Sequence, residues 1–225
     1  MKNKQKLTAA ELSESLASDP VYQGKLVAQN QRAAEVEAAS APLLADLAAV
    51  GFSVNSVDEL RAHSPIPSPA AQVLLRWLGR LSIPALQDAI VRDLAYVEEP
   101  FDVRPLLVLF EQTASDSLRW AIANTLAELR PLDAREWVIS TLNNREYGRA
   151  REMLPLALAR IAPSNVANTV LLKHLDEMPG HVALGLAESG GLVEADVISR
   201  RALSEKGWIR KELERAARKI RKRVK

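Results

Sequence analysis

The chain has 225 residues, of which 48% are hydrophobic and 26% charged, and its formal net charge is +2. This composition excludes an intrinsically disordered chain and is typical of a helix-rich globular protein, because Ala and Leu dominate and Gly is scarce. The absence of cysteine excludes disulfides, thiolate catalysis and cysteine-based zinc sites.

Two features that the sequence lacks, a membrane-spanning segment and a signal peptide, bear on the location of the protein. No apolar run approaches the roughly 18–20 residues that cross a bilayer. Residues 1–16 are basic but lack the apolar core of a signal peptide. We therefore expect a soluble cytoplasmic protein that makes no membrane contact.

The N-terminal 40 residues predict two polar helices. The spacing of Thr8 and Glu11 is that of a capping box and predicts a helix up to Ala17. A long, mostly polar helix is predicted from Pro20 onwards. We expect residues 1–40 to form a helical cap that packs on the following repeats, because the end of a repeat array must hide its apolar face.

The first helical pair is predicted over residues 41–81. Its first helix is "APLLADLAAVG" (Ala41–Gly51) and its second is "PAAQVLLRWLGRL" (Pro69–Leu81). Between them lies a long loop with three prolines and one helical turn at Val57–Arg61. We expect residues 41–225 to form one continuous domain with no linker inside it.

Over roughly residues 69–222 the chain repeats itself about every 30 residues. The first helix of each unit carries a column of apolar residues spaced 32, 32, 28 and 31 residues apart: Leu94, Leu126, Leu158, Leu186 and Ala217. The residue just before this column is small in four of the five units, and Asp93 is the exception. A second column marks the second helices: Leu106, Val138, Val170 and Ile198. Two helices per period and no strand signal predict an all-α fold, an α-solenoid of about five helical hairpins.

The pattern R-x-x-[apolar]-x-x-x-L-A in the first helices resembles the bacterial type of HEAT repeat. It occurs in "RWAIANTLA" (Arg119–Ala127), in "REMLPLALA" (Arg151–Ala159) and more weakly in "RKELERAAR" (Arg210–Arg218). Gln87 and Pro179 occupy the arginine position in two other units. The resemblance implies a fold but no activity, because HEAT arrays serve many unrelated roles.

The sequence offers little catalytic chemistry. His63, His174 and His181 share no metal-binding spacing, and no nucleophile elbow or nucleotide-binding glycine motif is present. We therefore expect no metal, no cofactor and no enzymatic activity, and the leading interpretation is a non-catalytic scaffold that holds a protein partner.

The resemblance implies that the second helices line a concave binding surface. We expect this surface to hold the partner through four residues: Arg104, Arg135, Trp137 and Lys173. For Trp137, core filling and partner recognition are equally compatible with the sequence. The recurring Arg119, Arg151 and Arg210 have two interpretations. They either bond helix-end carbonyls and carboxylates of neighbouring units or form a basic strip for anions.

The last 20 residues carry a net charge of +8, so the rest of the chain carries −6. A few cations at the end of a helix complement its dipole, but so many also favour contact with DNA or RNA. The candidate residues for this contact are Arg218, Lys219, Arg221, Lys222 and Arg223. The HEAT-like alkylpurine DNA glycosylases bind duplex DNA in a basic groove. The second helices here mix both signs of charge, so a glycosylase is the least favoured alternative.

A small-molecule pocket between residues 1–40 and the 51–69 loop is a third possibility. The partner's identity and the oligomeric state stay open at this point.

Overall fold

The structure, a computed structural model, describes Thr8, Ser15 and residues 17–225. The described chain is all-helical, which confirms the predicted class. Its α-helices are α2 (Pro20–Ala49), α3 (Ser68–Leu78), α4 (Pro84–Asp93), α5 (Arg104–Gln112), α6 (Asp116–Leu129), α7 (Arg135–Asn143), α8 (Leu154–Ile161), α9 (Ser164–Lys173), α10 (Pro179–Ser189), α11 (Leu192–Ala202) and α12 (Gly207–Val224).

Short 3₁₀ helices lie between these elements: η1 (Val57–His63), η2 (Leu94–Tyr96), η3 (Leu132–Ala134) and η4 (Arg145–Arg151). The helical turn predicted at residues 57–61 is therefore confirmed. The only extended pairing in the described residues is an isolated bridge between Ile66 and Val97. No helix among residues 17–225 is both long enough and apolar enough to cross a membrane.

Local sequence signals explain where several helices begin and end. Proline occupies the first turn of α3, α4, α5, α8 and α10, where its missing N–H costs no hydrogen bond. The hydroxyl of Ser115 accepts a hydrogen bond from the backbone N–H of Leu118 and so caps α6. Arg130 ends that helix in a left-handed conformation with φ of 54°. These signals keep the helices short and the connections tight.

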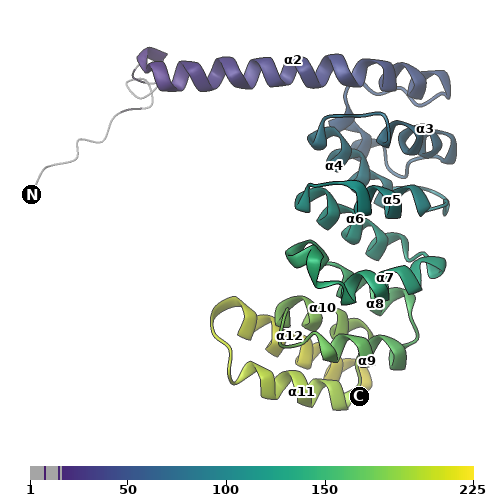
Figure 1. The fold of residues 1–225 in the computed structure, drawn as a ribbon, viewed down its shortest axis with the longest axis vertical. Helices are drawn as coiled ribbons and strands as arrows, with labels where there is room; N and C mark the ends of the chain where they lie inside the picture. The colour runs from purple at the N-terminus through teal and green to yellow at the C-terminus, as the bar shows by residue number, and fades with distance from the viewer. Residues whose placement is uncertain (1–7, 9–14, 16) are drawn as a thin grey trace, which may run out of the picture.

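The helices stack along the long axis of the molecule (Figure 1). Helices α4, α6, α8, α10 and α12 each contact the next in this series, whereas α5, α7, α9 and α11 each pack against the helix that follows them in the chain. The apolar columns predicted from the sequence lie in this contact layer. Leu94, Leu126, Leu158 and Leu186 are completely buried. The core is therefore a continuous seam between successive helices.

Small residues before the leucine column let these helices approach closely. A Cβ atom on Gly185 would lie 2.6 Å from the backbone oxygen of Pro155 in α8. At the matching position of α6, the buried hydroxyl of Thr125 donates a hydrogen bond of 2.8 Å to the carbonyl of Val91. Helix α10, which contains Gly185, is regular over its 11 residues.

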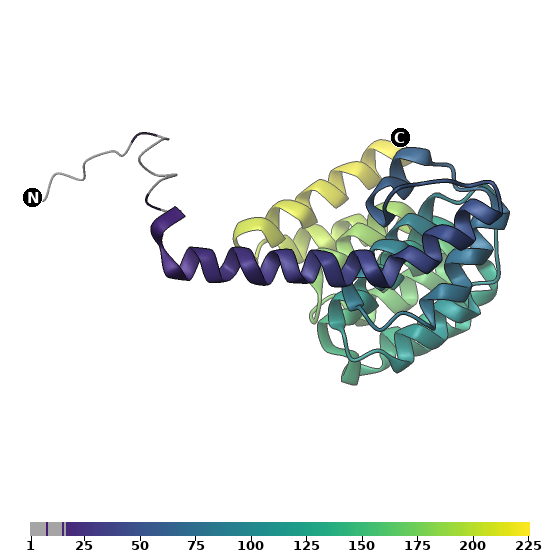
Figure 2. The ribbon, with the colours of Figure 1, turned by 90° about the horizontal axis from the view of Figure 1, so that it is seen from above.

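The N-terminal region differs most from the sequence prediction. The expected break after residue 40 does not occur, because α2 is one helix of 30 residues with Pro42 inside it. Leu43 and Leu47 are buried and hold the second half of α2 on the body, so the helix continues although Pro42 lacks an N–H. The first half extends past the stack with most of its side chains exposed (Figures 1 and 2).

The expectation that residues 1–40 pack as a cap is therefore wrong for residues 20–35. Most of these residues have no described element to bury against, because the stack begins only beneath the second half of α2 (Figure 1). The helix expected over residues 8–17 lies mostly outside the described residues.

Candidate interaction surfaces

A recurring hydrogen bond ties successive helical pairs together. In three units, a side chain in the first helix or just before it donates to a carbonyl nine residues earlier, in the last turn of the preceding helix. The three pairs are Gln87 to Leu78 at 3.0 Å, Arg119 to Phe110 at 3.0 Å and Arg151 to Leu142 at 2.6 Å. Carbonyls in the last turn of a helix have no partner within the helix. Each bond therefore satisfies a helix end and fixes the next unit on it.

Arg151 is the most enclosed member of this series. Its side chain is 2% exposed, and all three guanidinium nitrogens have partners. Nε donates to the carbonyl of Gly148, Nη1 to that of Leu142, and Nη2 to the carboxylate of Glu177. Glu177 also faces Nδ1 of the buried His174 at 3.5 Å. Of the two interpretations of the arginine column, the basic strip for anions does not describe Arg151, because its guanidinium is buried and bonded within the chain.

The other two arginines of the column, Arg119 and Arg210, also have partners within the chain. Arg119 contacts Asp116 at 3.4 Å and lies over the ring of Tyr147, at 5.0 Å from the ring centre. Arg210 pairs with Glu214 at 2.8 Å. The helix-locking interpretation of this arginine column therefore describes Arg119 and Arg151, and Gln87 fulfils the same role with an amide.

The four predicted partner-binding residues lie on α5, α7 and α9 and do not form a cluster. Arg104 pairs with Asp102, and Arg135 pairs with its neighbour Glu136. Trp137 packs edge-on against the buried ring of Phe110 and donates its indole N–H to Glu111 at 2.7 Å. Of the four, only Lys173 is exposed and has no ion-pair partner among the described residues.

A series of alternating charges, here called the ladder, runs across helices α6, α8, α10 and α12. Glu128, Arg160, Glu188 and Lys219 occupy equivalent positions, two residues after the apolar column, in four successive units. Nη1 of Arg160 lies 2.8 Å from Oε1 of Glu128, and Nζ of Lys219 lies 2.8 Å from Oε1 of Glu188. The hydrogen bond from Lys219, helped by the charge of Arg160, lowers the pKa of the Glu188 carboxyl.

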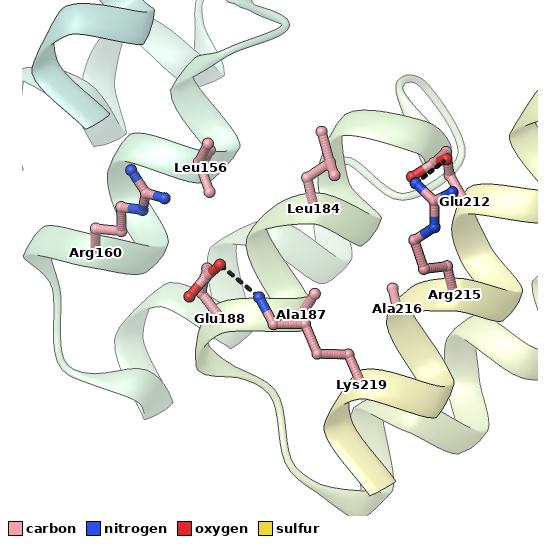
Figure 3. Close-up of a pocket in the computed structure, with 9 residues that line it drawn as sticks. All are labelled: Leu156, Arg160, Leu184, Ala187, Glu188, Glu212, Arg215, Ala216 and Lys219. Atoms are coloured by element: carbon pink, nitrogen blue, oxygen red, sulfur yellow. Dashed lines mark hydrogen bonds and ion pairs between the residues drawn. The ribbon is translucent and has the colours of Figure 1, made fainter. Parts of the chain in front are cut away.

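This ladder borders a shallow groove of about 280 Å³ between α8, α10 and α12 (Figure 3). Leu156, Leu184 and Ala187 contribute its apolar lining, and the third cation at its edge, Arg215, pairs with Glu212 at 3.0 Å. Every cation lining the groove therefore has a carboxylate partner. The groove has no surplus charge with which to hold an anion.

Arg210 pairs with Glu214 within α12, and the basic residues that follow it, from Lys211 to Lys225, fall into two groups. Three of them hold the helix on the body. Lys219 pairs with Glu188, Arg221 pairs with Asp196 at 2.9 Å, and Arg223 donates to the carbonyls of Ala187, Glu188 and Gly190 at the end of α10. These three residues, predicted to contact nucleic acid, are thus engaged in packing α12 against its neighbours.

The second group faces away from the body. The buried residues of α12 are Leu213, Ala216, Ala217 and Ile220. On the opposite face of the helix lies a row of five exposed cations, here called the outer row: Lys211, Arg215, Arg218, Lys222 and Lys225. Among the residues that the structure describes, only Arg215 of this row has a carboxylate within ion-pair distance. The sequence prediction includes Arg218 and Lys222; the helical spacing of 4, 3, 4 and 3 residues adds the other three.

The first half of α2 offers an apolar surface. A heptad stripe runs along one face of this helix: Tyr22, Leu26, Gln29, Ala33, Val36, Ser40, Leu43 and Leu47. Ser40, Leu43 and Leu47 are buried against the body. Tyr22 and Leu26 continue the same face but are 40% and 38% exposed. At the base of this exposed part lies a groove of about 540 Å³, whose apolar lining comes from Ala33, Val36, Leu44, Val57 and Leu86.

Two buried polar side chains elsewhere, Asp93 and His174, have partners within the chain. Asp93, the exception in the small-residue column, is 7% exposed, and its Oδ1 lies 3.8 Å from Nε of Arg61. Burial disfavours the charged carboxylate and raises the pKa of Asp93 to about 6, although Arg61 opposes the shift. His174 bonds the side chain of Asn143 at 3.0 Å. No group of three or more His, Asp or Glu side chains suited to a metal ion occurs within the described residues.

Comparison with known proteins adds no assignment. No family model, curated protein or solved structure matches this chain.

Proposed function

We propose that this chain is a non-catalytic binding protein, built as a HEAT-like α-solenoid of about five helical hairpins, that holds a protein partner on α2. The solenoid assignment is supported by the stacked seam of leucine columns and by the hydrogen bond that recurs from Gln87, Arg119 and Arg151. The binding assignment rests on one observation. The apolar stripe of α2 continues past the body, is covered by no element of the described chain and lies next to a groove lined by apolar side chains.

An exposed stripe of this kind fits the recognition of a helical or extended protein segment. An amphipathic helix lays its apolar side chains, spaced three and four residues apart, into such a surface. Tyr22 and Leu26 supply the apolar contacts, and Arg32 and Glu37 beside the groove supply the polar border that specific interfaces carry. The binding site therefore moves from the second helices, as predicted from the sequence, to α2.

The second helices are less suited to this role. Arg104, Arg135 and Trp137 are each paired within the chain, and a partner would have to break those contacts. The same pairing argues against a basic groove for a glycosylase. We retain a cytoplasmic location as part of the proposal, on the grounds of the sequence.

Two charge substitutions on α2 test the binding proposal. Leu26→Glu places a carboxylate in the exposed stripe. The control Gln31→Glu adds the same charge on the opposite face of the same helix, where the side chain is also exposed. We expect both variants to fold like the wild type in circular dichroism, because neither position is buried.

Proteins retained by each immobilised variant from an extract of the source cells are then compared. The proposal predicts a protein that the wild type and Gln31→Glu retain and that Leu26→Glu does not. Identical retention by all three would contradict it.

A second candidate function, contact with nucleic acid, is favoured by a different observation, the outer row of α12, and is developed below.

A further inference from the structure

The two groups of cations on α12 differ in what the fold requires of them. Lys219, Arg221 and Arg223 point along the flanks of the helix and bond groups of α10 and α11. The outer row points the opposite way from the buried residues, and no hydrogen bond or ion pair joins it to another helix of the described chain. A helix dipole is complemented by charges in the last turn only. It therefore gives no structural reason for Lys211, Arg215 and Arg218, which lie further back.

We propose that the outer row of α12 docks on the phosphate backbone of double-stranded DNA. This surface is separate from α2, so the proposal stands or falls independently of the protein partner.

The geometry of the row suits a regular polyanion. Its members are three or four residues apart, which places successive cations about 4.5–6 Å apart along the helix at a rise of about 1.5 Å per residue. From Lys211 to Lys225 the row extends for about 21 Å. A strand of duplex DNA presents a phosphate about every 3.4 Å along its axis, so this length faces roughly six phosphates. Long Lys and Arg side chains bridge the remaining mismatch in spacing.

Duplex nucleic acid fits the row better than a single strand does. Binding of single strands relies on aromatic side chains on which bases stack. The only aromatic residue of α12 is Trp208, at the start of the helix. Its ring packs on Gly180, where an added Cβ would come within 2.6 Å of it, and lies edge-on to His181. Trp208 is still 60% exposed, but it lies at one end of the row, ahead of Lys211. No aromatic side chain lies among the five cations, so the contacts of the row are with phosphates.

An anionic membrane is the other large polyanionic surface, and α12 lacks the means to enter one. A membrane-surface helix buries an apolar face among the lipids. The apolar side chains Leu213, Ala216 and Ile220 are already buried against the protein body, opposite the row. Trp208 and Val224, at the two ends of α12, are exposed, but between them every exposed side chain of the helix is a cation. This surface favours a phosphate backbone.

The row contains only Lys and Arg, with no Asn, Gln or apolar side chain to read base edges. Binding is therefore expected to be independent of sequence and strongly dependent on salt. With four cations free of carboxylate partners, the logarithm of the binding constant should fall with the logarithm of salt concentration with a slope of about −4.

The test is a titration of a fluorescein-labelled 20-base-pair duplex of arbitrary sequence with the full-length chain at 50, 100 and 200 mM salt. One variant carries Lys211→Gln, Arg218→Gln and Lys222→Gln. The matched control removes three exposed cations away from α12, with Arg76→Gln, Arg130→Gln and Arg200→Gln. Vesicles of phosphatidylcholine and phosphatidylserine, and a single-stranded oligonucleotide, are titrated in parallel.

We expect the wild type and the control to bind the duplex at 50 mM salt. The outer-row variant should bind at least tenfold more weakly. Its salt slope should be about 2.7 units shallower, because each phosphate that a cation neutralises accounts for about 0.9 of the slope. Absence of duplex binding by the wild type at 50 mM salt would overturn the proposal. So would equal weakening in both variants, or tighter binding to vesicles or single strands than to the duplex.

Discussion

Arg151 offers the sharpest test of how the helical pairs are locked together. We expect Arg151→Met to destabilise the protein strongly. Methionine keeps the apolar stem but removes the donors to Gly148, Leu142 and Glu177. A hydrogen bond involving a charged group contributes about 1.5–3 kcal/mol, and breaking a buried ion pair costs about 3–5 kcal/mol.

Part of this cost is offset, because the Glu177 side chain is 32% exposed and water can solvate it. We therefore expect the free energy of unfolding to fall by about 3–5 kcal/mol. At roughly 2–4 °C per kcal/mol for a chain of this size, the melting temperature should fall by roughly 6–20 °C.

Urea unfolding followed by circular dichroism measures the change. Arg149→Met is the matched control, because Arg149 lies two residues away and its side chain is 88% exposed. It should unfold like the wild type. A decrease below about 1 kcal/mol for Arg151→Met would refute the reasoning, since it would mean that Arg151 contributes no more than an ordinary surface arginine.

Three further predictions concern stability. Asp93→Asn should be more stable than the wild type at pH 8. The pKa of Asp93 is raised from 3.8 to about 6, so the charged carboxylate destabilises the folded state. At 1.36 kcal/mol per pKa unit, the gain in the free energy of unfolding is up to about 3 kcal/mol. The wild type should regain this stability as the pH falls through 6 towards 4, because the carboxyl of Asp93 then becomes protonated. In urea unfolding, the difference in stability between Asp93→Asn and the wild type should therefore be smaller at pH 5 than at pH 8. An equal difference at both pH values would contradict this prediction. Gly185→Ala should lower the free energy of unfolding by about 1–3 kcal/mol, measured by thermal unfolding, because the added Cβ forces α8 and α10 apart. The control Gly24→Ala lies in open space on α2 and should raise the helix content. Equal effects of the two substitutions would count against close packing at Gly185. Arg223→Gln should lower the melting temperature by freeing three carbonyls of α10, and Lys222→Gln should not; equal melting temperatures would show that the two groups of cations on α12 do not differ.

Sequence periodicity predicted the all-helical class and the buried columns because a leucine every 30 residues is a direct consequence of stacking one helix on the next. It also led to an incomplete view of the locking bonds. Gln87 looks like a gap in an arginine column, yet an amide N–H reaches the same helix-end carbonyl as a guanidinium. A search for arginine alone therefore misses Gln87, because the position requires only a side chain that donates a hydrogen bond.

The charges of α12 show where sequence reasoning stops. Lys222 and Arg223 are adjacent and equally basic, yet one faces outwards and the other bonds the end of α10. Their roles depend on which face of α12 packs against the body, and the spacing of Leu213 and Ile220 already contained that information. The free part of α2 was harder to foresee, because the heptad stripe is the same in its buried and exposed halves and only the position of the stack separates them.

The proposed function depends most directly on whether the exposed stripe of α2 contacts another protein. Because the chain contains no cysteine, a single one introduced by Leu26→Cys can carry a benzophenone photocrosslinker without side reactions. Gln31→Cys places the same probe on the opposite face of the helix. After illumination in an extract of the source cells, the account predicts a discrete crosslinked protein from position 26 and none from position 31. Crosslinks from both faces alike, or from neither, would contradict the assignment of α2 as the binding surface.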